Sequence, residues 1–152
     1  MITIIRTNSD NPDFKGLVKL LDQDLTQRYG VVQTKYNKFN VLQSLDTVAI
    51  AKVNGEAVGC GCFKVYDKKT VEIKRMFVKA EHRGMGIAAQ ILGELETWAI
   101  ERGFSRAVLE LANKQPEALR VYQRQGYRLI ENYGQYVGLE ISMCFSKDLA
   151  AA

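Results

Sequence analysis

Residues Val71 to Thr97 read VEIKRMFVKAEHRGMGIAAQILGELET, and the rest of the chain can be placed around them. About eight residues rich in β-branched and aromatic types predict a strand, and the long amphipathic run Ile87–Ile100 predicts a helix. Between them lies the turn Arg83-Gly84-Met85-Gly86. Glycines let a backbone come close to a ligand, and the first turn of a helix has free N–H groups at its positive end. The stretch therefore predicts a phosphate or pyrophosphate site.

The sequence before this stretch predicts a strand at 2–6 and a helix that begins at Pro12 and ends near Tyr29. Proline at the first helical position and apolar residues at helical spacing support that helix. Residues 31–44 mix aromatic with amide side chains, and we expect a short helix or a lid-like loop there. Such a segment would line a substrate pocket or pack over the core.

A hairpin is predicted next, from strands at 47–53 and 57–66 joined by Asn54-Gly55. Asparagine and glycine suit the two positive φ angles of a type I′ turn. Gly59 and Gly61 in the returning strand predict a bulge or the close approach of another backbone.

After the central stretch, a strand at 106–112 should lie parallel to the strand at 71–78, because a helix intervenes. Glu94, Glu96 and Glu101 are expected on the outer face of that helix. Pro116 begins a further helix, which Gly126 ends, and strands at 127–133 and 139–147 close the chain. In the last strand the apolar Leu139, Ile141, Met143 and Phe145 alternate with Glu140, Ser142, Cys144 and Ser146. This alternation predicts that the apolar set is buried.

The predicted order β-α-β-β-β-α-β-α-β-β indicates an α+β or mixed α/β fold. Its sheet should be mostly antiparallel with one parallel junction. At 152 residues, 47% of them hydrophobic, the chain is expected to be a single domain over 1–152. The free edge of the closing strand pair would allow a homodimer, which the sequence does not decide.

The composition excludes several classes of function and of binding site. The formal charge of +4 comes from scattered lysines and arginines, so a nucleic-acid site is not favoured. No signal peptide and no apolar run of about 18 residues is present, so we expect a cytoplasmic protein without a membrane partner. Three cysteines without CxxC spacing and a single histidine argue against disulfides, a zinc site or a His-based triad.

The glycine turn can be compared with the known phosphate-binding motifs. Gly84 to Ala89 formally match the GxGxxA dinucleotide fingerprint. Lys79–Arg83 separate that match from its strand, however, and the chain lacks the repeated parallel βα units of dinucleotide-binding folds. A P-loop is excluded because no GK[ST] follows.

The pattern Arg83-x-x-Gly86-x-Ala88 resembles the acetyl-CoA motif Q/R-x-x-G-x-G/A of the GNAT superfamily of N-acetyltransferases. Residues 115–122, QPEALRVY, followed by Gln125-Gly126-Tyr127, are similar to a second family segment, N/Q-x-x-A-x-x-x-Y…G-F/Y. The resemblance covers about 47–133. It implies a sheet that is splayed between its central parallel strands, with acetyl-CoA in the gap as co-substrate and no metal.

The resemblance also implies site residues. Backbone N–H groups of 83–88 would hold the CoA pyrophosphate, the edge of 76–78 would pair with the pantetheine amides, and the N–H of Val78 would stabilise the oxyanion. The implied acetyl-CoA-binding residues are Met76, Phe77, Val78, Arg83, Gly84, Met85, Gly86, Ile87, Ala88, Gln115 and Tyr122.

The implied reaction is direct attack of an amine on the acetyl thioester. Tyr122 matches the family's general-acid tyrosine, and Glu72 is the expected base, with Glu110 on the neighbouring strand as the alternative. Aromatic residues predict the acceptor pocket and favour a small, amino-acid-like primary amine; they are Tyr29, Tyr36, Phe39 and Tyr136. Two other functions stay open at this point: a protein or peptide N-acetyltransferase, and a non-catalytic acetyl-CoA-binding sensor.

Overall fold

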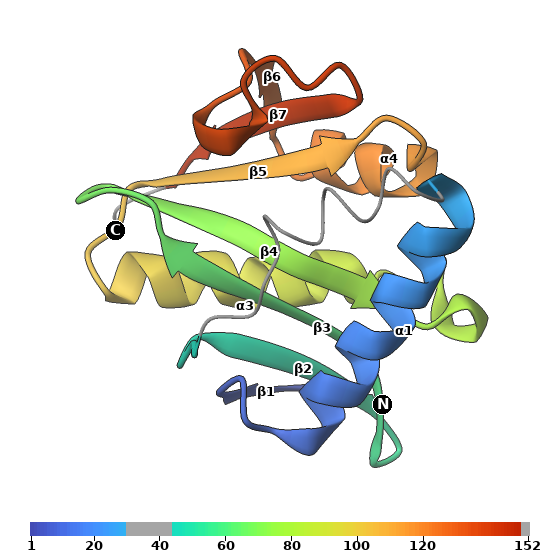
Figure 1. Cartoon of the computed structure of the whole chain (residues 1–152). Helices are drawn as coiled ribbons and strands as arrows, with labels where there is room; N and C mark the ends of the chain where they lie inside the picture. Colours follow the sequence, from blue (N-terminus) through green and yellow to red (C-terminus); the bar gives the residue numbers. More distant parts are fainter. Residues whose placement is uncertain (30–43, 150–152) are drawn as a thin grey trace. The chain divides into compact units, whose positions relative to one another are not determined.

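The computed structural model describes residues 1–29 and 44–149, and its helices and strands follow the order expected from the sequence (Figure 1). The elements are β1 (Ile2–Thr7), α1 (Pro12–Tyr29), β2 (Val48–Val53), β3 (Glu56–Val65), β4 (Thr70–Val78), η1 (Ala80–His82), α3 (Ile87–Glu101), β5 (Arg106–Ala112), α4 (Pro116–Arg124), β6 (Arg128–Ile130), η2 (Gly134–Tyr136) and β7 (Ser142–Asp148). Hydrogen bonding joins the strands in the order β1-β2-β3-β4-β5-β7-β6. The mixed α/β fold class is thereby confirmed.

The chain divides into two compact units, which are described one at a time. The first unit contains Met1–Cys62 and Arg75–Leu95, and the second contains Phe63–Lys74 and Glu96–Ala152. The residues of β3, β4 and α3 are therefore divided between the two units. The expectation of a single domain over 1–152 stays a prediction.

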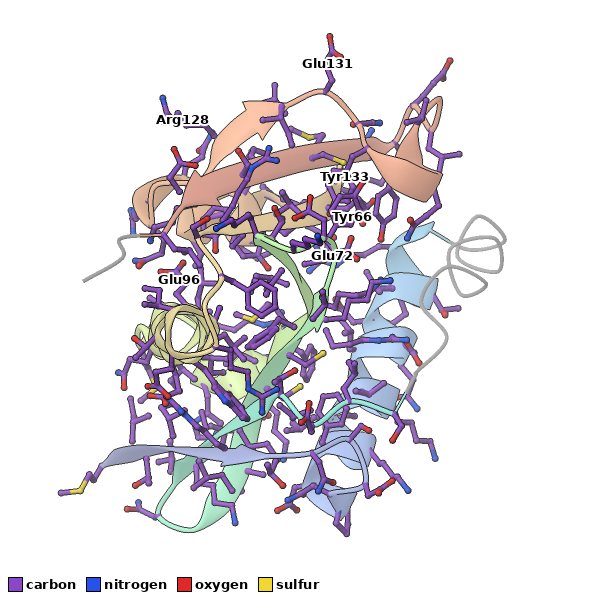
Figure 2. All side chains as sticks on the ribbon, turned by 90° about the vertical axis from the view of Figure 1, so that its left-hand side faces the viewer. Tyr66, Glu72, Glu96, Arg128, Glu131 and Tyr133 are labelled. Atoms are coloured by element: carbon purple, nitrogen blue, oxygen red, sulfur yellow. The ribbon has the colours of Figure 1, made fainter. Side chains whose placement is uncertain are left out.

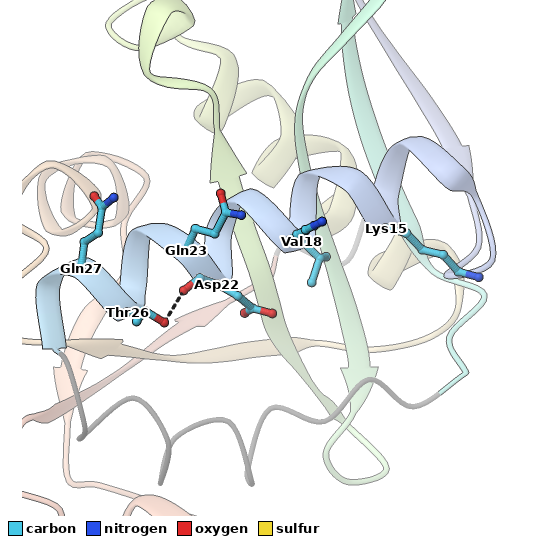
Figure 3. A pocket seen from close by; sticks show the side chains of 7 residues that line it. Lys15, Val18, Asp22, Gln23, Thr26 and Gln27 are labelled. Atoms are coloured by element: carbon cyan, nitrogen blue, oxygen red, sulfur yellow. Dashed lines mark hydrogen bonds between the residues drawn. The ribbon is translucent and has the colours of Figure 1, made fainter.

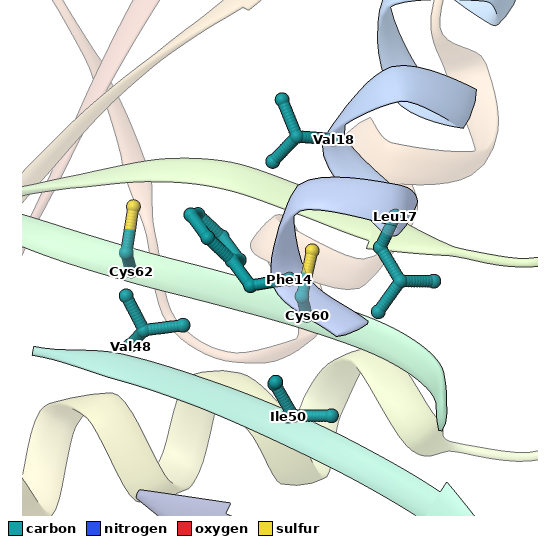
Figure 4. Close-up of a cluster of buried hydrophobic side chains, with 7 residues drawn as sticks. All are labelled: Phe14, Leu17, Val18, Val48, Ile50, Cys60 and Cys62. Carbon is teal, nitrogen blue, oxygen red and sulfur yellow. The ribbon is translucent and has the colours of Figure 1, made fainter. Parts of the chain in front are cut away.

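The core of the first unit lies between α1 and the strands β2 and β3 (Figure 4). Helix α1 begins where the sequence predicts: Asn11 Oδ1 accepts the N–H of Asp13 at 2.8 Å, and Pro12 is the first helical residue. The buried side chains of this core are Phe14, Leu17, Val18, Val48, Ile50, Cys60 and Cys62. Residues at i, i+3 and i+4 of the helix thus face alternate residues of the strands.

The hairpin between β2 and β3 has the predicted turn, with φ of 51° at Asn54 and 85° at Gly55. The predicted bulge is also present, as a register shift between Ala51 and Lys52. A Cβ at Gly59 would lie 3.0 Å from the carbonyl oxygen of Phe77, so this glycine lets β3 approach the backbone of β4.

The second unit contains the parallel junction. β4 pairs with β5 in parallel over Thr70–Glu72 and Arg106–Val108, and β7 lies antiparallel to β5 and to β6. The ladder between β4 and β5 contains only three residue pairs, as expected if these two strands splay apart. Phe63 contacts Trp98 edge to face, with ring centroids 6.0 Å apart, at the apolar centre of this unit.

The bounds of the closing strands and two details of burial differ from expectation: β6 is Arg128–Ile130 and β7 is Ser142–Asp148, rather than 127–133 and 139–147. The side chain of Glu96 is only 12% exposed, because the Tyr127 hydroxyl donates to it at 2.9 Å and the Lys147 ammonium at 2.8 Å. In β7 the predicted burial is wrong: Cys144 is fully buried next to the buried Phe145, and Ser142 is buried as well. Successive strand residues point to opposite faces, so both faces of β7 are covered. No helix in the described part of the chain is long and apolar enough to cross a membrane.

Candidate active site

In the first unit, the end of β4 packs against the hydrophobic core and is hydrogen-bonded to the turn that follows it. Phe77 packs against the core under α1, and Val78 is 8% exposed. The Arg83 Nε–H donates to the carbonyl oxygen of Val78 at 2.9 Å, and the guanidinium lies 5.7 Å from the centre of the Phe77 ring. The Arg83 side chain therefore closes the loop that connects β4 to α3.

The glycines of this loop have the conformation that the motif requires. Gly84 and Gly86 have φ of 80° and 78°, and a Cβ at either position would have no heavy atom within 4 Å. Their backbone thus faces open space, where a ligand can approach closely. Ile87, 1% exposed, anchors the first turn of α3, and Ala88 follows it. This open left-handed turn before a helix start fits a pyrophosphate group.

In the second unit, Glu72 is a buried and fully engaged carboxylate (Figure 2). It is 2% exposed, and its Oε2 accepts the hydroxyl hydrogen bond of Tyr133 at 2.7 Å. The ammonium groups of Lys64 and Lys74 lie 3.7 Å and 3.9 Å from Oε1. A buried charge is tolerated when it is paired and hydrogen-bonded, and Glu72 meets both conditions.

Glu110 on β5 is the second carboxylate of this unit and has a different environment. Ser142 donates its hydroxyl to Oε2 at 2.8 Å. Burial raises the pKa of Glu110 to about 7; the charge of Glu72 raises it too, while the Ser142 hydrogen bond and the charge of Lys74 oppose the shift. Glu110 can therefore exchange a proton near neutral pH.

Tyr122, the predicted acid, lies on α4 and is 7% exposed. Burial raises its pKa, and the nearby charge of Glu110 raises it further, so the hydroxyl keeps its proton at neutral pH. Its ring contacts Tyr127 edge to face at 5.9 Å. Gln115, just before α4, accepts the N–H of Leu119 through its backbone carbonyl at 3.1 Å.

A group of three tyrosines lies beside Glu72. Tyr133 contacts Tyr66 and Tyr136 edge to face, with centroids 5.1 Å and 5.5 Å apart. Tyr136, predicted to line the acceptor pocket, is only 1% exposed and packs against the Tyr133 ring. Tyr36 and Phe39 lie outside the described residues, as does the side chain of Tyr29, the last residue of α1.

The sequence predictions missed several partners of the carboxylates: Lys64, Lys74, Ser142 and the hydroxyl of Tyr133. One signal was available, because Lys74 is two residues from Glu72 and so shares its face of β4. Within 1–29 and 44–149, no group of three or more His, Cys, Asp or Glu residues could hold a metal ion.

A separate pocket of about 580 Å³ runs along α1 in the first unit (Figure 3). Six of its seven lining residues are of polar or charged type; the lining residues are Lys15, Val18, Lys19, Asp22, Gln23, Thr26 and Gln27. None of the site residues discussed above lines it.

Comparison with known proteins identifies the class. The family model described as the acetyltransferase (GNAT) family matches residues 14–127, so this chain belongs to that family. It is 28% identical to an IAA acetyltransferase of Azospirillum brasilense over 97% of this chain and 98% of that protein. A protein of Klebsiella pneumoniae described as an acyl-CoA N-acyltransferase has the same fold, with a TM-score of 0.82, 24% identity and 99% of both chains covered.

A GNAT acetyltransferase of Elizabethkingia anophelis, solved with acetyl-CoA bound, also shares the fold, with a TM-score of 0.70 and 20% identity over 97% of this chain and 98% of that one. Family membership confirms that the protein is an acetyl-CoA-dependent N-acetyltransferase with acetyl-CoA as its co-substrate.

Proposed function

We propose that the enzyme transfers the acetyl group of acetyl-CoA to the primary amine of a small, amino-acid-like acceptor by direct attack on the thioester. The observation that carries this proposal is the polar cluster of Glu72, Glu110, Lys64, Lys74 and Tyr133 in the second unit. It combines a group able to take a proton near pH 7 with a partly exposed lysine, Lys64, that can pair with an acidic acceptor.

The proposed co-substrate contacts are those of the first unit. Open left-handed backbone at Gly84 and Gly86, followed by the start of α3, supports a role for 83–88 in holding the pyrophosphate. Backbone groups of Met76–Val78 pair with the pantetheine amides, and the Val78 N–H donates to the oxyanion. The exposed side chain of Met85 and the amide of Gln115 complete the proposed contacts.

For the proton transfers, we assign the acid role to Tyr122 and the base role to Glu110 rather than Glu72. An acid must hold its proton until the thiolate leaves, and a buried tyrosine with a raised pKa does so. A base works best with a pKa near the working pH, which describes Glu110. Glu72, held by Tyr133 and two lysines, is suited to orienting its neighbours.

The charges around Glu110 support an acceptor with a carboxylate. Lys64 and Lys74 balance the two carboxylates while Glu110 is ready to act as a base, so no excess negative charge repels an acceptor carboxylate. The Lys64 side chain is 31% exposed and can pair with that carboxylate. The Tyr66 ring, 43% exposed, offers an apolar surface next to it.

Thiol release from acetyl-CoA tests the proposal with matched acceptors, for example phenylalanine against phenethylamine. We expect kcat/KM to be roughly fivefold higher for the amino acid, because one favourable ion pair contributes about 1 kcal/mol. Lys64→Met should remove the preference, and Lys68→Met, an exposed lysine of the β3–β4 turn, should leave it unchanged. Equal rates for both acceptors would refute the acceptor class. Turnover confined to peptides would identify a peptide N-acetyltransferase, and binding without any turnover a sensor.

We also infer a cytoplasmic location, since Cys60, Cys62 and Cys144 are buried thiols that form no disulfide, as in proteins of reducing compartments. The homodimer stays a prediction. Leu129 on the edge strand β6, 65% exposed, lies where such a contact would form.

A further inference from the structure

Within β4, Arg75 has a backbone conformation that non-glycine residues rarely adopt. Its φ is 59°, in the left-handed region, and it stands directly before the three residues assigned to acetyl-CoA. A residue of this kind persists only where its surroundings hold it in place. The first unit holds Arg75 through both its side chain and its carbonyl group.

The side chain of Arg75 forms an ion pair with α1. Its Nη1 donates to Asp22 Oδ1 at 3.1 Å, and the arginine side chain is 9% exposed, whereas that of Asp22 is 43% exposed. Asp22 also belongs to the wall of the pocket along α1 (Figure 3). A guanidinium buried to this degree needs a counter-charge, and Asp22 supplies it.

The main chain of Arg75 is held by a contact with the neighbouring strand β3. The Cys60 thiol donates to the Arg75 carbonyl oxygen at 3.4 Å, and burial, the first of several causes, raises the pKa of Cys60, so the thiol keeps its proton. Two residues further along β4, the Phe77 carbonyl oxygen lies 3.0 Å from the position of a Cβ on Gly59. The path of β4 from Arg75 to Phe77 is therefore set by close contacts with β3 on one side and by α1 through Asp22 on the other.

We propose that the Asp22–Arg75 ion pair positions the backbone of Met76–Val78 for acetyl-CoA. The inference rests on the proposed role of that segment in co-substrate binding. The ion pair fixes the left-handed residue, and this residue sets the direction in which the following N–H and C=O groups point. Asp22 and Arg75 are positioning residues: neither touches the co-substrate.

Calorimetric titration with CoA and steady-state kinetics test the proposal. Arg75→Gly removes the guanidinium but tolerates the left-handed φ, so it separates the ion pair from backbone strain. We expect Asp22→Asn and Arg75→Gly each to weaken CoA binding three- to tenfold, with the same factor in the KM for acetyl-CoA. The double variant should be no weaker than the worse single one, because both changes remove one interaction. Arg75→Lys, which keeps the charge, should recover part of the affinity.

Asp24→Asn is the matched control, since it breaks an ion pair with Arg28 at 3.2 Å on the same helix without reaching β4. It should leave CoA affinity unchanged. Wild-type CoA affinity in Asp22→Asn and Arg75→Gly, together with a lower melting temperature, would show that the pair only stabilises the fold. Fully additive losses in the double variant would also overturn the inference. Failure of the wild-type enzyme to bind CoA would instead refute the assigned binding segment.

Discussion

The hydroxyl of Tyr133 donates to Oε2 of Glu72 at 2.7 Å, which ties the loop before η2 to a buried carboxylate of β4. Burial raises the pKa of Tyr133, and the charge of Glu72 raises it further, so the hydroxyl keeps its proton and remains a donor at neutral pH. The contact fixes one face of the proposed acceptor site.

Tyr133→Phe should therefore destabilise the protein by about 1–3 kcal/mol, the usual result of leaving one oxygen of a buried carboxylate without its donor. Urea unfolding measures the loss. Tyr66→Phe is the control: Tyr66 is 43% exposed and keeps its ring contact with Tyr133, so we expect a change within about 0.5 kcal/mol. Equal small effects of both variants would show that the hydrogen bond contributes little.

The pH dependence of kcat/KM should report the ionisation of Glu110. As a base, Glu110 acts only when deprotonated, so the rate should rise with pH and level off above about 7. Glu110→Gln should lower kcat/KM by roughly 10²–10⁴-fold and abolish this limb of the profile. If Glu72→Gln removed the limb and Glu110→Gln retained it, the base assignment would be reversed.

Glu110 should also make stability depend on pH. Its folded-state pKa of about 7 is above the ordinary 4.5, so the folded protein binds this proton more tightly than the unfolded chain. The contribution of Glu110 to the free energy of unfolding is therefore fully present below about pH 4.5 and is lost as the pH rises through about 7. Between pH 5 and pH 8 the wild-type protein should lose about 2–3 kcal/mol relative to Glu110→Gln, measured by urea unfolding at both values.

Glu131→Gln, at an exposed position of the same unit, is the control for that experiment (Figure 2). It should follow the wild-type protein at both pH values. A constant difference between wild type and Glu110→Gln from pH 5 to pH 8 would mean that Glu110 titrates in the folded protein as it does in water.

Tyr122→Phe should reduce kcat by roughly a hundredfold or more with little change in the melting temperature, because it removes the proposed proton donor and keeps the ring. Tyr127→Phe is the control, because it removes a neighbouring tyrosine hydroxyl that has no proposed role in the reaction. It removes the hydrogen bond to Glu96, so stability should fall while kcat stays close to the wild-type value. Unchanged kcat in Tyr122→Phe would refute the acid assignment without affecting the family.

Most of the fold could be predicted because its signals are local. Asn54-Gly55 specifies a turn by φ alone, and Pro12 with Asn11 specifies a helix start. The buried face of β7 could not be predicted, since Cys144 and Phe145 point to opposite faces and both are covered by partners distant in sequence. Alternation indicates burial reliably only when one face of a strand meets solvent.

The candidate site, too, has one part that the local sequence predicts and another that depends on residues distant in the sequence. The glycine turn is a local motif, and its left-handed φ values follow from the residue types. The environments of Glu72 and Glu110 depend on Tyr133 and Ser142, which are 61 and 32 residues away along the chain. Sequence reasoning could name both carboxylates but could not assign them different roles, because that difference comes from tertiary contacts.

Two glycines of β3 allow a final prediction about co-substrate binding. A Cβ at Gly61 would meet the flexible sulfur of Met76 and the side chains of Ile91 and Leu95, all of which can move slightly. A Cβ at Gly59 would instead meet the carbonyl oxygen of Phe77, part of the backbone proposed to pair with pantetheine. Both alanine variants should lose about 1–3 kcal/mol of stability through overpacking. Gly59→Ala should in addition weaken CoA binding, by calorimetry, more than Gly61→Ala does. The opposite ranking would mean that the edge of β4 does not contact the co-substrate.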